Sequence, residues 1–309
     1  MKIVRTTSFL LVATFFGLWL SVYLPLEFEL FLSYVLIISF GILHGANDVE
    51  VLTSYFHKRE ISMSKVSLTL LYILLIATIY AIFYVFPAIA LLLFVVFSGY
   101  HFGEQHWSGT LKRQLKGKSL FYTLYGALIL FMLFYSHIPQ VGGIVKDITG
   151  NSVPTYIFGQ IFLGLGISVG LFLLYFGCSG SKGSSILLEL FLLGVFYVIF
   201  NTASLLWAFC IYFVIWHSIP SLLDQMRFLY GEVSWKTFYR YFRSSFVYWL
   251  VSVLGTLGLY LFLKINEEFL LSSLICFLAS ITVPHVLVMT KIEEYLKTHP
   301  KANIGGDAQ

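Results

Sequence analysis

Long runs of apolar residues, separated by short polar stretches, recur from one end of the chain to the other. A helix needs ~20 apolar residues to cross the ~30 Å hydrocarbon core of a bilayer. Ten runs with few or no charges approach or exceed that length: 6–25, 28–44, 66–86, 88–107, 119–137, 155–178, 184–201, 203–219, 245–264 and 269–289. The pattern predicts an all-α protein, a polytopic bundle of about ten transmembrane helices. Because the second, seventh and eighth runs are slightly short, one or two re-entrant segments stay open.

The polar positions predict the orientation of these helices. With the N-terminus in the cytoplasm, 17 of the 19 Lys and Arg residues fall on the cytoplasmic side, and Lys146 and Lys264 fall outside. Both termini are then cytoplasmic. The first run lacks a small-residue cleavage pattern and is expected to remain as the first helix. No polar domain interrupts the runs, so residues 1–296 are expected to form a single transmembrane domain and residues 297–309 a polar, disordered tail.

Composition agrees with a membrane protein. Of the 309 residues, 59% are hydrophobic and 11% are charged, whereas a soluble domain has about 25% charged residues. The net charge of +4 is too small to indicate nucleic-acid binding. Cys178, Cys210 and Cys276 are far apart in apolar segments, so we interpret them as packing residues without a disulfide.

The eight histidines divide into two groups. Three are expected to be solvated, because they lie at or beyond predicted helix ends: His57, His137 and His299. The other five lie inside or at the border of apolar runs, where an ionisable group is costly and predicts a functional site: His44, His101, His106, His217 and His285.

The predicted topology groups four of these five. His44, His101, His217 and His285 lie near the ends of helices that run from outside to inside, so all four are expected at one depth near the cytoplasmic face. Four imidazoles at one depth can share a metal ion such as Fe, Zn, Cu or Ni. The bland alternative is four histidines that each hydrogen-bond across a helix interface. His106, on another face from His101, is kept as a reserve ligand or supporting group.

Two carboxylates stand where they could support these ligands. A metal-binding histidine usually gives its second ring N–H to a carboxylate or a carbonyl. Asp48 follows His44 by four residues and Glu104 follows His101 by three, which places each on its histidine's helical face if the helix continues. Glycines next to two of the histidines would let helices approach closely. The alternative is that Asp48 and Glu104 are charges at the membrane interface, beyond the end of a helix, with no role at a metal site.

Four short motifs in this order resemble one known family. They are GILHGAND at 41–48, SGYHFGE at 98–104, WHSIP at 216–220 and TVPHVLVM at 282–289. Together with the hydrophobicity and the length, they resemble the bacteriorhodopsin-related-protein family (Brp/Blh) of bacterial β-carotene 15,15′-dioxygenases over nearly the whole chain.

The resemblance implies an enzyme with a non-haem Fe(II) centre. Such an enzyme cleaves the central double bond of β-carotene with O₂ and gives two molecules of retinal, without an organic cofactor. His44, His101 and His217 match the family's motifs as iron ligands, and His285 matches its Pro-His motif. The expected setting is the bacterial cytoplasmic membrane, where a carotenoid enters from the lipid and a retinal-binding rhodopsin takes the product.

The chain departs from the family pattern in three places. Leu43 and Val49 replace a proline and a histidine that are frequent in the first motif. The third motif commonly has a second histidine one helical turn after the first, and Ser221 occupies that position here. His285, His106 or a solvent molecule therefore completes the metal sphere, and the sequence leaves these alternatives open.

Two other functions fit parts of the pattern. A haem-binding membrane electron-transfer protein also places paired histidines on neighbouring helices, but usually at both depths of the membrane. A proton-coupled transporter could use the histidines and Asp48 as a relay, but the expected paired broken helices are not evident in the sequence.

Overall fold

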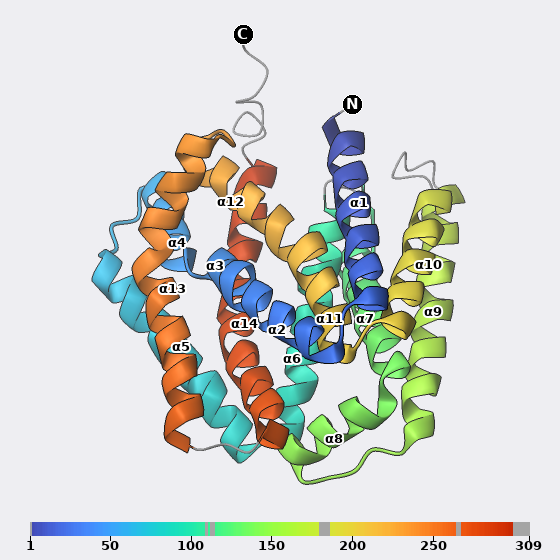
Figure 1. Cartoon of the computed structure of the whole chain (residues 1–309). Helices are drawn as coiled ribbons and strands as arrows, with labels where there is room; N and C mark the ends of the chain where they lie inside the picture. Colours follow the sequence, from blue (N-terminus) through green and yellow to red (C-terminus); the bar gives the residue numbers. More distant parts are fainter. Residues whose placement is uncertain (1, 109–110, 112–114, 179–185, 264–266, 299–309) are drawn as a thin grey trace. The chain divides into compact units, whose positions relative to one another are not determined.

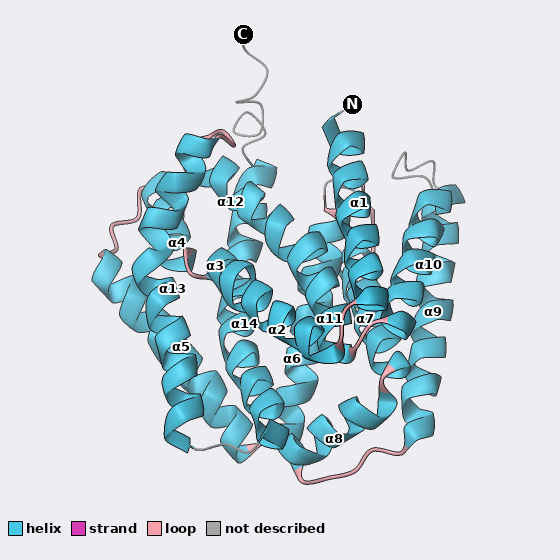
Figure 2. Ribbon diagram, viewed as in Figure 1, coloured by secondary structure: helices cyan, strands magenta, loops and turns pink. Residues whose placement is uncertain are grey.

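The computed structural model describes residues 2–108, 111, 115–178, 186–263 and 267–298. Every regular element within these ranges is a helix (Figures 1 and 2), which confirms the predicted all-α class. The elements, of which η1 and η2 are π-helices, are α1 (Lys2–Tyr23), α2 (Leu26–Leu36), η1 (Ile37–Gly41), α3 (Ile42–Gly45), α4 (Asp48–Lys58), α5 (Lys65–Val85), α6 (Pro87–Trp107), α7 (Lys118–Ser136), α8 (Ile138–Thr149), α9 (Thr155–Cys178), α10 (Ile186–Thr202), α11 (Leu205–Cys210), η2 (Ile211–Ser218), α12 (Ile219–Tyr230), α13 (Trp235–Leu263) and α14 (Glu267–Thr298).

The ten predicted runs fall largely on helices wherever their residues are described. Within the described ranges, seven helical stretches are long and apolar enough to cross a membrane: Leu26–Lys58, Lys65–Val85, Pro87–Trp107, Lys118–Ser136, Thr155–Gly177, Leu205–Tyr230 and Ile275–Glu293. The runs predicted at 6–25 and 184–201 appear as shorter apolar helices, Ser8–Tyr23 and Ile186–Thr202. These helices indicate a membrane protein. The count of ten spans and the cytoplasmic termini stay predictions.

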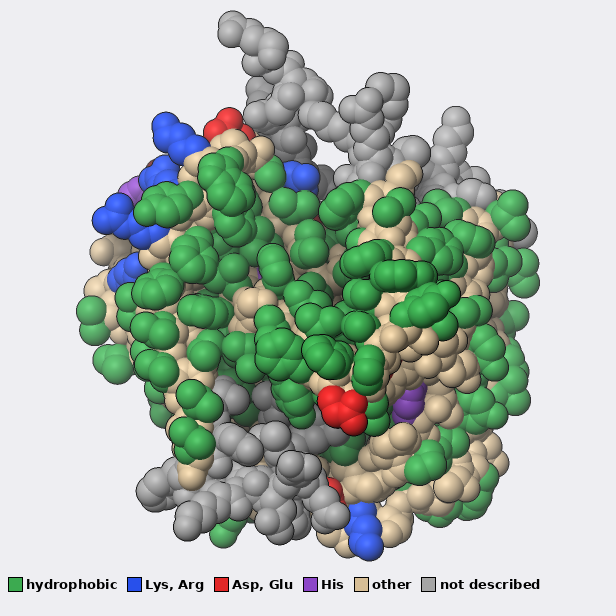
Figure 3. All heavy atoms as spheres, viewed as in Figure 1, with side chains coloured by type: hydrophobic (Ala, Val, Ile, Leu, Met, Phe, Trp, Pro, Cys, Tyr) green, Lys and Arg blue, Asp and Glu red, His purple; other side chains and the backbone are tan. Residues whose placement is uncertain are grey.

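The surface also suits a lipid environment. Apolar side chains cover much of the face seen in Figure 3, and on α9 alone Leu163, Leu171 and Leu174 are each more than 60% exposed. Lys and Arg side chains gather instead near the ends of α4 and α13, at the upper left of Figure 3. A bilayer requires apolar side chains on the surface and backbone N–H and C=O groups that are hydrogen-bonded within the helices, and these helices meet both requirements.

The chain divides into two compact units, each built from two separate stretches of sequence. The first unit comprises Met1–Ile37 and Val95–His217, and the second comprises Ile38–Phe94 and Ser218–Gln309. The prediction of one transmembrane domain over 1–296 stays a prediction.

In the first unit, α7 is packed on most sides. Its buried residues include Phe121, Tyr125 and Ile129. A side chain at Gly103 of α6 would run into the backbone carbonyl of Tyr122, and one at Gly126 of α7 would run into the carbonyl of α6 that faces it. The backbones of α6 and α7 are therefore in direct contact, which confirms the close approach expected beside His101.

Polar contacts join the start of this unit to its end. The indole N–H of Trp207 donates to the carbonyl of Gly17 at 3.1 Å, and the indole N–H of Trp216 donates to the hydroxyl of Thr14 at 2.8 Å. These bonds fasten α1 to α11 and η2, which carry the chain to His217.

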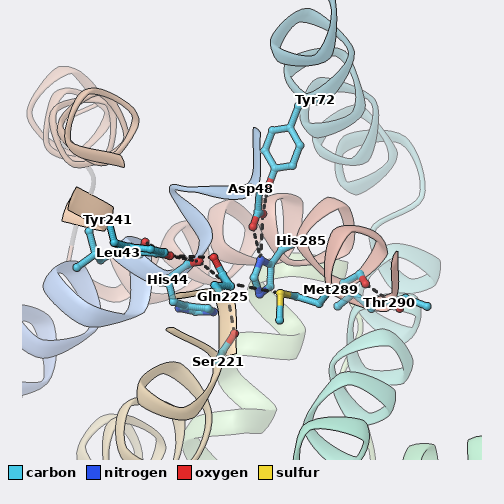
Figure 4. A network of polar contacts seen from close by, with 11 residues as sticks. Leu43, His44, Asp48, Tyr72, Ser221, Gln225, Tyr241, His285, Met289 and Thr290 are labelled. Atoms are coloured by element: carbon cyan, nitrogen blue, oxygen red, sulfur yellow. Dashed lines mark hydrogen bonds and ion pairs between the residues drawn. The ribbon is translucent and has the colours of Figure 1, made fainter. Parts of the chain in front are cut away.

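In the second unit, two apolar clusters hold the helices together. One joins α4, α12 and α14 through Val51, Tyr55, Phe228, Val288, Met289 and Ile292. The other joins α3, α12 and α13 through Leu43, Leu222, Met226 and Tyr241. Lys58 ends α4 with its ammonium 2.8 Å from the carbonyl of Phe228 and 3.9 Å from the centre of that ring. The clusters fix α3, α4, α12, α13 and α14, and every residue labelled in Figure 4 except Tyr72 of α5 belongs to these helices.

Irregular helical turns occur beside three of the predicted ligands. The π-helix η1 ends three residues before His44, and the π-helix η2 contains His217. Pro284 lies inside α14 directly before His285 and has no N–H for the preceding turn. Both π-turns and prolines disturb regular helices and are frequent at functional sites.

Two predicted loops lie largely outside the described residues. The tail predicted from residue 297 begins within α14, which ends at Thr298, and residues 299–309 lie outside. Residues 177–185, whose glycines and serines predict a flexible turn, lie outside from residue 179 onwards.

Candidate metal centre

His285 is held by a carboxylate in the interior of the second unit. Its Nδ1 lies 2.9 Å from both carboxylate oxygens of Asp48, the first residue of α4 (Figure 4). A carboxylate only accepts hydrogen bonds, so Nδ1 carries the proton and Nε2 is left as the metal-binding nitrogen. Both side chains are almost fully buried, and Asp48 lies in the first turn of α4.

His44 lies beside His285 in the same unit. The two rings have their centres 4.8 Å apart and meet edge to face at 87°. His44 belongs to α3, a helix of four residues, and is buried. Gly45 follows it, and a side chain there would lie 3.8 Å from Nδ1 of His285. That separation is an ordinary van der Waals contact, so position 45 lies directly against the ring of His285.

The backbone at His44 is fixed by a buried polar network (Figure 4). Gln225 Nε2 donates to the carbonyl of His44 at 2.8 Å, and the hydroxyl of Tyr241 donates to Gln225 Oε1 at 2.9 Å and lies 3.2 Å from the same carbonyl. Gln225 Nε2 also lies 3.5 Å from the hydroxyl of Ser221. Ser221, where the family pattern commonly has a histidine, thus joins the network that supports His44 through its backbone.

The first unit contains a second pair of histidines. His101 of α6 and His217 of η2 have ring centres 4.7 Å apart at 80°, and each is 2% exposed. Phe102 and Phe213 lie against the ring of His217, with centres 4.7 Å and 5.5 Å away. Each unit therefore brings together two of the four predicted ligands, edge to face and buried.

The family comparison bears directly on these pairs. A family model described as beta-carotene 15,15'-dioxygenase matches residues 35–293, which include all four histidines. The chain belongs to this family. No curated protein and no solved structure matches the chain significantly. The family assignment confirms the resemblance seen in the motifs and points to carotenoid dioxygenase activity.

The donor set fits the iron of a dioxygenase. All four candidate ligands are imidazoles, which suit iron among other transition metals. The carboxylate of Asp48 is turned to Nδ1 of His285 as a supporting group. His44, His101, His217 and His285 are the residues that could hold the ion. The expectation that they bind one ion stays a prediction.

The supporting carboxylates differ from expectation in one case. Asp48 was predicted to hydrogen-bond to His44, whereas in the structure its carboxylate binds Nδ1 of His285. The reason is local: α3 ends at Gly45 and α4 begins at Asp48, so the helix does not continue and the two residues do not share a face. Glu104 is buried and accepts a hydrogen bond from the hydroxyl of Tyr100 at 2.7 Å.

His106, the reserve ligand, takes part in another cluster of the first unit. Its Nε2 lies 2.8 Å from the carboxylate of Glu189 on α10, and its ring stacks on Tyr125 of α7 at 5.0 Å. The hydroxyl of Tyr125 lies 3.3 Å from both partners. Sequence reasoning missed Glu189, although an acidic residue inside an apolar run was the available signal.

The three histidines predicted to be solvated have different outcomes. His57 is exposed, as predicted, and His299 lies outside the described residues. The prediction for His137 is wrong, because the ring is 7% exposed and its nitrogens lie 3.2 Å and 3.0 Å from the carbonyls of Leu133 and Ala203. Those carbonyls replace water as partners where α7 gives way to α8.

Proposed function

We propose that this protein cleaves β-carotene at its central 15,15′ double bond with O₂ and releases two molecules of retinal. Each carbon of the broken double bond takes one oxygen atom of O₂, so the reaction balances without a reductant. The proposed metal is Fe(II), with His44, His101, His217 and His285 as its protein ligands.

The observation that carries the proposal is the family match over residues 35–293, which spans two buried pairs of histidines. The chain itself connects the pairs. His217 is the last residue of the first unit, and Ser218, where the second stretch of the second unit begins, follows it within η2. A single peptide bond within a helical turn thus joins His217 to the unit that contains His44 and His285. Ionisable side chains inside membrane helices are costly and mark functional sites, which is consistent with metal ligands at these four positions.

The chain's own residues would have three tasks. When bound, iron would supply the activation of O₂. Asp48 would keep the proton of His285 on Nδ1 and the ring in one orientation. Phe102 and Phe213, packed on His217, would exclude water from the place where the polyene reacts. The apolar surface would admit the carotenoid from the lipid. The cellular setting we propose is the bacterial inner membrane, with a retinal-binding rhodopsin as the acceptor of the product.

The test is production of retinal in cells. The chain is expressed in a bacterial host that accumulates β-carotene, and retinal and residual carotene are quantified by chromatography. We expect retinal at two molecules per carotene consumed, and its loss in His44→Ala, His101→Ala, His217→Ala and His285→Ala. His57→Ala is the matched control, because His57 is exposed, and it should keep full activity.

The cell assay and the purified protein together separate the other functions. Absence of retinal and unchanged carotene, with the protein shown in the membrane, would refute the proposal. A Soret band would indicate a haem protein instead. Proton-coupled uptake by vesicles without bound metal would indicate a transporter.

A further inference from the structure

Tyr72 of α5 binds the far side of the carboxylate that holds His285. Its hydroxyl donates to Oδ2 of Asp48 at 2.6 Å (Figure 4). Its ring is half-buried and packs against the apolar cluster of α4, α12 and α14. The expected partners of the histidines did not include a tyrosine, so this contact adds a component to the site.

The three side chains form one line of hydrogen bonds across three helices. The hydroxyl of Tyr72 donates to Asp48, and Nδ1 of His285 donates to the same carboxylate at 2.9 Å. Both donors contact Oδ2, and Nδ1 also lies 2.9 Å from Oδ1, so the carboxylate is held by donors from two helices. A carboxylate fixed in this way in turn fixes the plane and tautomer of the imidazole.

The need for such a device follows from the position of Asp48. As the first residue of α4, Asp48 follows the break in the helix at Ala46 and Asn47. The backbone around Asp48 is only the first turn of a helix, whereas Tyr72 lies in the middle of the regular helix α5. The hydroxyl of Tyr72 is therefore the contact from a rigid element that sets the carboxylate.

We propose that Tyr72 is a positioning residue for the metal ligand His285 and acts through Asp48. This inference rests on the metal centre of the proposed function. It requires that the Tyr72 hydroxyl affect metal binding, and that it do so only while the Asp48 carboxylate is present. A tyrosine that merely packs would require neither.

The test measures metal affinity apart from catalysis. The full-length protein is purified in detergent, stripped with a chelator and titrated with Co²⁺, whose d–d absorption reports binding. Removing a supporting partner of a metal-bound histidine typically weakens affinity about 10- to 100-fold, and we expect about 10-fold for Tyr72→Phe. Tyr84→Phe on the same helix is the matched control, because Tyr84 is 89% exposed, and its affinity should equal that of the parent.

A double-mutant cycle tests the route through Asp48. Asp48→Asn keeps the shape of the side chain but removes its charge. If Tyr72 acts through the carboxylate, Tyr72→Phe should weaken Co²⁺ binding in the parent and add less than twofold in the Asp48→Asn background. The melting temperature of each metal-free variant is recorded beside the affinity, and Tyr72→Phe should leave it within a degree or two of that of the parent.

Three results would overturn the inference: unchanged Co²⁺ affinity in Tyr72→Phe, an equal further loss in the Asp48→Asn background, or a loss of affinity matched by a large fall in the metal-free melting temperature. A parent that binds no Co²⁺ would overturn it together with the metal centre. A parent that binds Co²⁺ but releases no retinal from carotene when loaded with iron would refute the proposed function alone, and the Co²⁺ cycle would still decide the role of Tyr72.

Discussion

The carboxylate of Glu189 lies 2.8 Å from Nε2 of His106, and the two side chains are 4% and 15% exposed. This pair joins α10 to α6 within the first unit. His106 follows His101 by five residues on α6. The hydroxyl of Tyr125 lies 3.3 Å from both side chains. His106, which the sequence suggested as a reserve metal ligand, therefore has a carboxylate as its partner.

Removing the carboxylate of Glu189 should destabilise the protein. Breaking a buried pair leaves a polar group without its partner, and we expect Glu189→Ala to lower the free energy of unfolding by about 3 kcal/mol. Thermal or denaturant unfolding in detergent measures this change. Glu27→Ala is the control, since Glu27 is exposed, and it should stay within about 0.5 kcal/mol of the parent. Equal stability of the two variants would contradict the prediction.

Gly103→Ala should also destabilise the protein, by separating α6 from α7. The added methyl group meets the backbone carbonyl of Tyr122, which cannot move aside as a side chain can. We expect a loss of about 1–3 kcal/mol in unfolding experiments. Gly164→Ala on α9, where no atom lies within 4 Å of the added carbon, should be stabilising by about 0.5–1 kcal/mol. A neutral Gly103→Ala would show that the helices can separate freely.

The bond between Trp216 and Thr14 should appear as an energetic coupling. The Thr14 hydroxyl donates to the carbonyl of Leu10 and accepts from the indole of Trp216. Trp216→Phe and Thr14→Val should each lower stability, and their coupling energy in a double-mutant cycle should be about 0.5–1.5 kcal/mol. Additive effects would mean that the bond contributes nothing. Because Trp216 precedes His217, retinal production should fall in the same variants.

Removal of metal should abolish carotene cleavage. Protein stripped with a chelator is expected to form no retinal, and Fe²⁺ should restore the activity under air. Zn²⁺ should occupy the imidazoles without restoring activity, because it has no redox chemistry. Retinal formation by protein shown to be free of metal would count against the proposed centre.

The sequence predicted the helical segments well because apolar runs of membrane length have few other solutions. It missed α8, whose residues Lys146 and Asp147 interrupt the apolar pattern, and it treated α4 and α12 as loop or helix end. These helices pack one face only, and a search for uniformly apolar runs passes over them.

The candidate site was predicted in part. The pairing of His44 with His285, and of His101 with His217, agrees with the expectation that these residues gather. The partner of Asp48 was predicted wrongly because the helix break after Gly45 carries no strong sequence signal. Tyr72 is one of 20 tyrosines, and only the arrangement of α5 beside Asp48 distinguishes it from the others.

The discontinuous make-up of the two units has a consequence for how the protein is made. Both stretches of the first unit have left the ribosome's active site once His217 is added, whereas the second unit lacks α12, α13 and α14 at that stage. His101 and His217 can therefore meet in a nascent chain, but His44 must wait for His285, more than 200 residues later. A chain that stops before His285 would insert into the membrane as a largely helical protein and still lack one of its four predicted ligands, so only a chain extended past His285 has the full set.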